Sequence, residues 1–471
     1  TLLYHGVLPR YAFPTDVATF HIFDTHRSDE FRPVFEFAPS QGLAIALTQY
    51  APGKMIWVAG KCYMSGAIYN PIKKERYQQW RERRLHLDCR RCGYSHLVHM
   101  GKGVEEGQLL DCPACSGHNT FGPAKIWFRP TGFAHPAGVP PITVPDELPI
   151  TSYATRAKLT MSSDNVLWLK LNDRIRYDSV REHLLVSNTG PSREGYSFCS
   201  SCGCIEAAAE PHPKLFGRHR KPYPDKKSPD CAEYISKNVV LGTDFITDVA
   251  LFSFKVEKPM RLLAADTISQ IALRTVCEAL ARAATNLLEI EANEIMAEFR
   301  PALTEKGVKG YETEIFLYDT LSGGAGYSKQ AAEKGMALFE EARKILLDCK
   351  DQCDMSCYRC LRTFRNRLDH GLLDRHIGVA LLDYFISGVL PVFSEKRLRV
   401  STDLLIADLI RQPGSDTSFE KINATAQGQG PLIRATNRHG NIRVISVGNP
   451  LFFDGSISTA AASRPAVCEW P

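Results

Sequence analysis

The chain has 471 residues, 44% of them hydrophobic and 23% charged, and carries a formal net charge of +5 at pH 7. This length and composition are typical of a globular protein with two to four domains. No run of 18 apolar residues is present, because Asp383 and Pro391 interrupt the nearest candidate at 377–393, and we therefore expect no membrane span. The N-terminus lacks a signal-peptide pattern, so we expect a cytoplasmic protein.

Positive charge is concentrated in residues 73–91, where eight basic residues stand against three acidic ones, a net charge equal to that of the whole chain. Clustered positive charge attracts polyanions through counterion release. Nucleic acid is therefore the first partner to consider, and a solvated helical face is the alternative. The basic residues expected to contact DNA here are Lys73, Lys74, Arg81, Arg83, Arg84, Arg90 and Arg91.

In the first half of the chain, residues 1–70 alternate short apolar runs with proline and glycine, which predicts strands and turns. Residues 71–86 are expected to be helical, and the proline-rich stretch 123–150 to be a loop or linker. Strands are predicted at 166–171 and 183–186, and a pair of strands at 239–256.

In the second half, apolar residues recur at helical spacing over 266–299, which predicts one long helix. A strand at 312–318 is followed by a glycine-rich turn at 321–326, and helices are predicted at 328–347 and 374–386. We interpret Asp319 and the turn glycines as a strand-to-helix connection rather than a phosphate or metal site. A nuclease-like carboxylate site built from Glu291, Glu294, Asp319 and Asp374 is a remote alternative.

Fifteen cysteines in a chain of this kind indicate metal binding rather than disulfides. The first group pairs Cys89-x2-Cys92 with Cys112-x2-Cys115, two knuckles about twenty residues apart. Four thiolates at this spacing predict a zinc ribbon with a closed, structural site.

The second group is Cys199-x2-Cys202, with Cys231 downstream and two histidines between them. It predicts a Cys3His zinc site. We prefer His219 to His212 as the fourth ligand, because His212 lies between two prolines, and Cys204 is an alternative ligand. Basic residues beside this group, expected to form a second DNA-contacting patch, are Arg218, Arg220 and Lys221.

The third group is Cys349-x3-Cys353-x3-Cys357-x2-Cys360. Its last three cysteines spell the C-x3-C-x2-C signature of radical-SAM enzymes, whose cluster needs one open iron. Cys349 is available to close the site, and the motif lies late in the chain at a helix end. A structural zinc site is therefore expected, with an iron–sulfur cluster as a remote alternative.

Residues 241–388 resemble the MrfA-type zinc-binding domain, found at the C-terminal end of certain DEAD/DEAH-type helicases. The matching pieces run from Leu241-Gly242-Thr243-Asp244 through Glu291-x2-Glu294, Tyr318-Asp319 and the glycine turn, to the four cysteines, Asn366 and Leu373-Asp374-Arg375. Proteins with this domain include MrfA-like DNA-repair helicases and anti-phage proteins such as the DISARM subunit DrmB and Druantia-type helicases. The resemblance implies an accessory zinc domain on, or beside, a DNA translocase.

The chain departs from helicases in having no G-x4-G-K-[ST] phosphate loop, no D-E-x-H box and no arginine motif. We therefore expect no ATP site and no catalytic residue in this chain. The helicase motor is expected either in trans or upstream in the same polypeptide.

Together these features predict an α+β, multidomain protein with three structural Zn²⁺ sites. It begins with a β-rich part carrying a zinc ribbon and continues into a mixed α/β zinc-binding domain. The expected segments are 1–80 (β-rich), 81–122 (zinc ribbon), 123–190 (linker and strands), 191–240 (second zinc module), 241–394 (MrfA-type domain) and 395–471 (tail). The expected function is a DNA-engaging helicase module in defence or repair, and the alternative is a scaffold subunit that binds a helicase. The sequence leaves the strand preference open.

Overall fold

The computed structural model describes residues 16–29, 31–143, 154–159, 166–208, 217–262, 266–303, 311–391, 395–411, 417–422, 431–449 and 451–452. The chain divides into two compact units. The first comprises residues 1–165, 179–249 and 318–329, and the second comprises 166–178, 250–317 and 330–471. The six expected segments remain a prediction.

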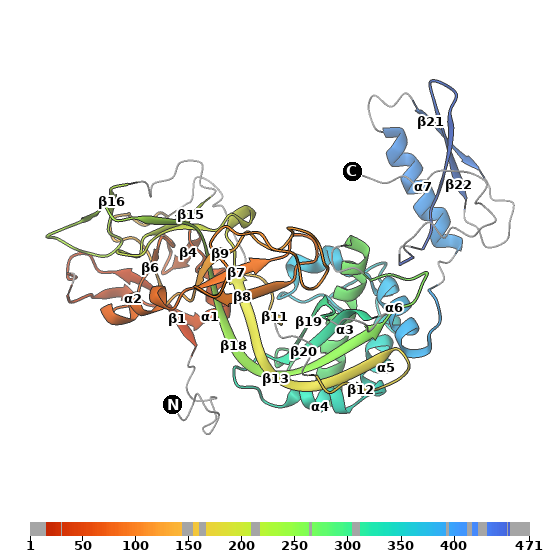
Figure 1. Cartoon of the computed structure of the whole chain (residues 1–471), viewed down its shortest axis with the longest axis horizontal. Helices are drawn as coiled ribbons and strands as arrows, with labels where there is room; N and C mark the ends of the chain where they lie inside the picture. The colour runs from red at the N-terminus through yellow and green to blue at the C-terminus, as the bar shows by residue number, and fades with distance from the viewer. Residues whose placement is uncertain are drawn as a thin grey trace. The chain divides into compact units, whose positions relative to one another are not determined.

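A small sheet in the first unit is built around β1 (Val17–Phe23) (Figure 1). Strand β1 pairs in parallel with β10 (Phe133–Ala134), which pairs with β6 (Ala67–Ile68). Antiparallel to β1 lie β2 (Phe35–Phe37) and β3 (Ser40–Gly42). Helix α1 (Leu43–Gln49) follows, and β4 (Met55–Val58) and β5 (Lys61–Met64) form a separate hairpin.

A larger sheet contains strands in the order β11-β13-β18-β9-β7-β8. Their bounds are β7 (Arg84–Asp88), β8 (Ser95–His99), β9 (Lys125–Phe128), β11 (Lys158–Leu159), β13 (Ile175–Asn188) and β18 (Ile235–Lys255), and β12 (Leu169–Lys170) pairs with β13. The hairpin of β14 (Tyr196–Cys199) and β15 (Ile205–Ala207) joins through β14 and β18. Helix α2 (Lys73–Arg81) precedes β7, and β16 (His219–Arg220) pairs with β17 (Asp230–Cys231).

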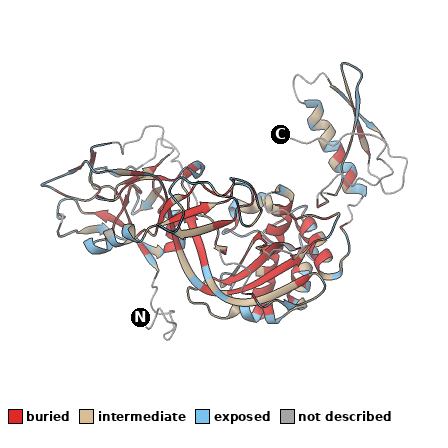
Figure 2. Cartoon of the chain, in the orientation of Figure 1, coloured by how far each residue is buried: buried red, intermediate tan, exposed pale blue. Residues whose placement is uncertain are grey.

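The second unit has a helical layer of α3 (Thr267–Leu288), α5 (Met336–Leu347) and α6 (Arg375–Ser387), which pack against one another (Figure 1). Strand β20 (Tyr311–Asp319) pairs with β18 and with β19 (Ile295–Pro301). The apolar residues 249–252 and Phe254 are all buried, as expected for a strand covered on both faces (Figure 2). Phe254 stacks on Phe385 of α6 with ring centroids 4.1 Å apart.

The remaining elements are α4 (Tyr327–Glu333), the 3₁₀ helices η3 (Pro191–Arg193) and η4 (Arg367–Leu372), α7 (Glu395–Arg411), and the antiparallel strands β21 (Thr417–Ile422), β22 (Leu432–Asn437) and β23 (Ile442–Ser446). The mixture of helices and several sheets agrees with the predicted α+β composition. Among the described helices, none is both long and apolar enough to cross a membrane.

Several predicted elements need correction. The helix expected over 71–86 ends at Arg81, and residues 84–86 belong to β7. The stretch 123–150, expected to be a loop or linker, contains β9 and β10, because its apolar residues 126–128 are buried in the larger sheet. The strand expected over 166–171 is limited to β12.

The helix expected over 266–299 ends at Leu288, because Glu289 adopts a left-handed conformation (φ 54°) and the chain turns into β19. The pair of strands expected at 239–256 is one continuous strand, β18. The helix expected over 328–347 is divided into α4 and α5 at Gly335, whose φ of 60° interrupts the helical path.

Candidate metal centres and nucleic-acid surface

The first cysteine group lies at the end of the β7–β8 hairpin. Cys89 follows β7, and the left-handed Gly93 (φ 72°) lets the chain turn back into β8. The sulfur atoms of Cys89 and Cys115 are 3.7 Å apart, and those of Cys92 and Cys112 are 3.6 Å apart. A tetrahedral zinc ion with Zn–S bonds of about 2.3 Å would place its sulfurs about 3.8 Å apart. The four thiols therefore fit one zinc ion and are too far apart for disulfides.

The environment of Cys89 favours its thiolate. The amides of Arg91 and Cys92 both donate to its Sγ at 3.4 Å. Burial acts to raise the pKa of the Cys89 thiol, but the Thr120 side chain and these amides outweigh burial and lower the pKa to about 7. Zinc binds the deprotonated thiolate, so the turn prepares this ligand for a metal.

The second group combines two hairpins, one carrying Cys199 and Cys202 and the other carrying His219 and Cys231. His219 lies directly opposite Cys231 in the pairing of β16 with β17. Its Nε2 lies 3.1 Å from Cys202 Sγ, and Cys199 Sγ lies 3.7 Å from Cys231 Sγ. All four residues are buried, and their ligand atoms lie within 4.8 Å of one another. This is the donor set of a Cys3His zinc site.

The tautomer of His219 suits a metal ligand. Its Nδ1 lies 2.9 Å from the carbonyl oxygen of Gly217, which can only accept a hydrogen bond. Nδ1 must therefore carry the proton, and the lone pair of Nε2 points towards the thiols. The alternative ligand His212 lies outside the described residues. Cys204 packs against the group without joining it, and burial raises the pKa of its thiol to about 12.

The third group occupies the loop between α5 and α6. Cys349 Sγ lies 3.6 Å from that of Cys353 and 3.5 Å from that of Cys357, while Cys360 Sγ lies 3.7 Å from both Cys353 and Cys357. These separations fit one tetrahedral ion. An iron–sulfur cluster distributes its thiolates over separate irons and would hold them further apart. Cys349 closes the group, so the radical-SAM signature does not leave an open position.

Some of the basic residues expected to contact DNA are half-buried or paired with a carboxylate, and others have exposed side chains. Arg84 is half-buried, with Nη2 2.7 Å from Asp244 Oδ1 and its guanidinium 4.4 Å from the ring centroid of Trp127. Arg83 is half-buried and lies 5.0 Å from the ring centroid of Trp80. Near the second group, Arg218 pairs with Asp230 and Lys221 with Asp225, both at 2.7 Å. Seven of the expected DNA-contacting residues are exposed, whether or not they pair with an acidic residue: Lys73, Lys74, Arg81, Arg90, Arg91, Arg218 and Arg220.

Amides of the turn after β20 donate hydrogen bonds to Asp319, the last residue of that strand. Asp319 is fully buried, and its carboxylate accepts hydrogen bonds from the amides of Ala325 (2.6 Å), Tyr327 (3.1 Å) and Ser328 (2.7 Å). Amides that would cradle a phosphate are thus already occupied. Asp374 similarly accepts from the first turn of α6. The metal-capable groups in the described residues contain neither carboxylate, so these residues give no support to a nuclease-like site.

Comparison with known proteins supports zinc as the metal of the third group. Residues 276–361, from the third turn of α3 to just beyond Cys360, match the model of the MrfA Zn-binding domain. The chain carries an MrfA Zn-binding domain. It is also 30% identical over 419 residues to the Druantia protein DruE of Escherichia coli (strain UMEA 4076-1), an alignment that covers 83% of this chain and 22% of DruE. The chain thus spans about a fifth of the length of that relative.

Two solved structures are similar to the chain. One is the DUF1998 helicase MrfA bound to DNA, with 11% identity, a TM-score of 0.35, and coverage of 78% of this chain and 34% of MrfA. The other is MrfA bound to DNA and AMPPNP, with 12% identity, a TM-score of 0.29, and coverage of 78% and 31%.

Residues other than the four cysteines hold the metal loop in place. The metal loop is the segment 348–374 between α5 and α6, which carries the third group. Asn366 is buried and donates to the Leu361 carbonyl at 3.0 Å and to Glu278 of α3 at 2.8 Å. Arg282 of α3 donates to the carbonyl oxygen of Cys360. Asn366 belongs to the matching motif in the sequence, but its role is visible only in the fold, because its partner Glu278 lies 88 residues away.

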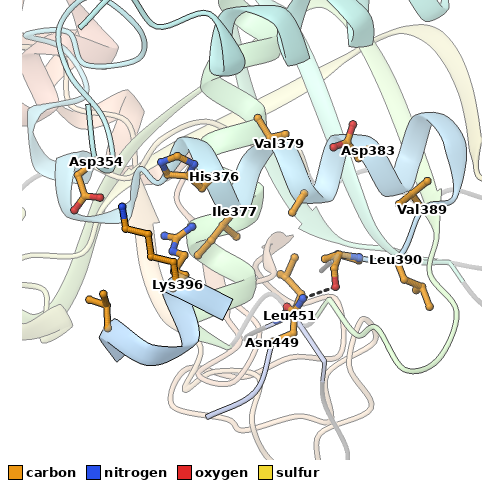
Figure 3. Close-up of a pocket in the computed structure, with 14 residues that line it drawn as sticks. Asp354, His376, Ile377, Val379, Asp383, Val389, Leu390, Lys396, Asn449 and Leu451 are labelled. Atoms are coloured by element: carbon orange, nitrogen blue, oxygen red, sulfur yellow. Dashed lines mark hydrogen bonds between the residues drawn. The ribbon is translucent and has the colours of Figure 1, made fainter. Parts of the chain in front are cut away.

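A cavity of about 590 Å³ lies beside the third group, between α6 and α7 (Figure 3). Its walls are mainly apolar, from Ile377, Val379, Val389 and Leu390, with Asp354, His376 and Lys396 at one end. Burial, with Arg375 and Arg397 nearby, lowers the pKa of His376. None of these residues belongs to a metal-capable group of the described chain.

Proposed function

We propose that this chain is a zinc-stabilised, DNA-engaging region of a DNA helicase or translocase that acts in anti-phage defence or DNA repair. The match of residues 276–361 to the MrfA Zn-binding domain carries the proposal. MrfA, for which the domain is named, is a DUF1998 helicase crystallised with DNA. The similarity to the Druantia protein DruE favours the defence role.

In this proposal each of the three groups holds one structural zinc ion. Each supplies four protein ligands, so no coordination position remains for a substrate or an activated water. The ligands in each group come from separate strands, turns or loop segments, and a bound ion would link them and contribute directly to folding. The motor activity is assigned to another part of the same polypeptide or to a separate subunit, because no phosphate loop is recognisable in this sequence.

The second candidate function is a scaffold that binds a helicase and touches DNA little. The ion pairs of Arg84, Arg218 and Lys221 favour it, because these cations are already partly neutralised by Asp244, Asp230 and Asp225. The two functions differ in how far the exposed cations contribute to DNA affinity.

The deciding experiment measures DNA affinity as a function of salt for the purified chain and for a variant with Lys74, Arg81, Arg90 and Arg91 changed to Gln. These side chains are exposed, so the fold should be retained. Each phosphate contact contributes about −0.9 to the slope of log K against log salt on duplex DNA. The proposal predicts weaker binding and a shallower slope for the variant.

A charge-matched control changes Arg27, Lys170, Arg399 and Arg411 to Gln. These residues are exposed too, but each lies beside its own carboxylate partner, at 2.6, 2.7, 2.5 and 3.7 Å respectively. Because both variants lose four charges, a general effect of net charge is cancelled. Equal affinities and slopes for the two variants would favour the scaffold, and absence of DNA binding by the unmodified chain would refute the proposed function.

A further inference from the structure

The segment Tyr358–Leu368, which begins inside the third metal loop, combines positive charge with exposed rings. It contains four arginines (Arg359, Arg362, Arg365 and Arg367) and no acidic residue. Phe364 is 77% exposed, Tyr358 67% and Leu368 62%. Single exposed apolar residues are ordinary. Three within eleven residues, interleaved with four arginines, form a surface that requires an explanation.

Contacts join the two rings into one surface. The ring of Tyr358 meets that of His370 edge-on, with centroids 5.5 Å apart. The Nε2 of His370 lies 3.0 Å from the carbonyl oxygen of Thr363, the residue next to Phe364. The guanidinium of Arg367 lies 4.8 Å from the ring centroid of Phe364. Aromatic rings and arginines therefore alternate across a continuous patch.

The base of this patch is held by buried contacts, although its side chains are exposed. Cys357 and Cys360 fix one end in the metal group, and the buried Asn366 fixes the other through Leu361 and Glu278. Thr363 N donates to Asn366 Oδ1 at 2.8 Å, which holds the backbone just before Phe364. A surface held in place before binding loses little conformational entropy when a ligand arrives.

The chemistry of the patch selects its ligand. Arginines attract a phosphate backbone, and an aromatic ring with a free face stacks on an unpaired base. In a duplex the base faces are covered by their neighbours, so protruding rings find no partner there. The core of a protein interface, by contrast, is depleted of charge, whereas four arginines lie here, of which Arg359 pairs with Asp351 at 3.2 Å.

We propose that the surface formed by Tyr358, Phe364, Arg365 and Arg367 binds single-stranded DNA by stacking its rings on unpaired bases. The inference rests on the proposed function and specifies its substrate: the strand that a helicase separates from the duplex. The metal group and Asn366 act as positioning elements that hold the rings outward.

The test compares the double variant Tyr358→Ala, Phe364→Ala with the unmodified chain, using labelled oligothymidine longer than the roughly 4–16 nucleotides that one single-strand-binding fold covers. A duplex of the same length is measured in parallel. Loss of base stacking at both rings predicts single-strand affinity reduced by roughly 30-fold or more, with duplex affinity changed far less. Because both rings are exposed, bound zinc and the unfolding transition should stay the same.

A matched control is Phe31→Ala, because Phe31 is also 77% exposed but lies in the first unit. It should leave single-strand affinity unchanged. Two further variants separate stacking from apolar contact: Phe364→Trp should retain binding, and Phe364→Leu should lose it. If the double variant binds single strands as tightly as Phe31→Ala, or if Phe364→Leu retains full affinity, the inference is wrong while the proposed function stands. If the unmodified chain binds neither form of DNA, the proposed function itself is wrong.

Discussion

The Nε of Arg375 donates to the backbone carbonyl oxygen of Cys353 at 2.7 Å. Arg375 opens α6, and its Nη1 also donates to the carbonyls of Leu346 (3.0 Å) and Leu347 (3.4 Å) in the last turn of α5. Carbonyls in a last helical turn lack partners within their own helix. One buried arginine therefore caps α5, begins α6 and holds the metal loop between them.

Replacing Arg375 with Ala should destabilise the second unit and loosen the third metal site. It leaves the carbonyls of Cys353, Leu346 and Leu347 without this donor, at a cost of about 1–3 kcal/mol for each group that stays buried and unpaired. Denaturant unfolding and the rate of zinc release to a chelator measure the two effects. Arg375→Lys should recover only part of the stability, because an ammonium cannot reproduce the planar fork.

Arg365→Ala is the control for this prediction, since Arg365 lies in the same region with an exposed side chain. It should leave both the unfolding transition and zinc release unchanged. Equal behaviour of the Arg375 and Arg365 variants would show that Arg375 does not support the site.

At the second group, His219→Ala should remove one equivalent of bound zinc, whereas Cys204→Ser should not. His219 Nε2 lies among the ligand atoms, and Cys204 only packs against them. His219→Cys should retain the metal, because a fourth thiolate satisfies tetrahedral zinc. Metal content of the purified variants checks this prediction, and loss of zinc from Cys204→Ser would assign the fourth ligand to that thiol instead.

Gly324→Ala should destabilise the turn after β20. Gly324 has φ of +74°, and a Cβ there would lie 2.0 Å from Asp248 Oδ2 and 2.9 Å from the Asp248 amide nitrogen. A left-handed conformation and a contact with backbone together predict a loss of at least about 1–3 kcal/mol of unfolding free energy. Gly371→Ala is the control, because a Cβ there meets nothing within 4 Å. Equal stabilities of the two variants would contradict the structural role of the turn.

Stability should fall on acidification because of His86, which is 2% exposed. Burial lowers the pKa of His86 from 6.5 to about 4, with Lys125 and Lys158 adding to the decrease and Asp88 opposing it. Between these values the unfolded chain binds more protons than the folded chain, so unfolding free energy is fully present above pH 6.5 and is lost as pH falls towards 4. At about pH 5 the loss should reach about 2 kcal/mol.

The measurement compares unfolding free energies of the unmodified chain and His86→Leu at about pH 7.5 and about pH 5. Leu has no titrating group, so its variant should lose about 2 kcal/mol less on acidification. Release of zinc in acid affects both proteins and cancels in the difference. Parallel losses in the two proteins would contradict the assignment to His86.

Local spacing was sufficient to predict the cysteine groups. The two-residue gap of Cys89 and Cys92 matches the short turn after β7, and the same holds for Cys199 and Cys202 after β14. Ligands that are distant in the sequence are harder to predict. The preference for His219 rests on the two prolines beside His212, and the pairing of His219 with Cys231 depends on a hairpin that composition does not reveal.

Charge counting alone misjudges the environment of a cation. Arg84 was grouped with the exposed basic residues because its partner Asp244 lies 160 residues away. Charge density alone does not single out the Tyr358–Leu368 surface, because residues 73–91 contain more basic side chains. Its signal was present in the sequence as four arginines with no acidic residue, interleaved with aromatic residues, but only the fold shows that Phe364 and Tyr358 point outward.

The number of metal ions bound to each chain tests the central claim, three closed single-zinc sites, most directly. Elemental analysis combined with native mass spectrometry of the purified protein should find zinc, close to three ions per chain, as the three groups of four ligands require. Two or fewer zinc ions per chain, or iron with visible absorbance, would contradict the account.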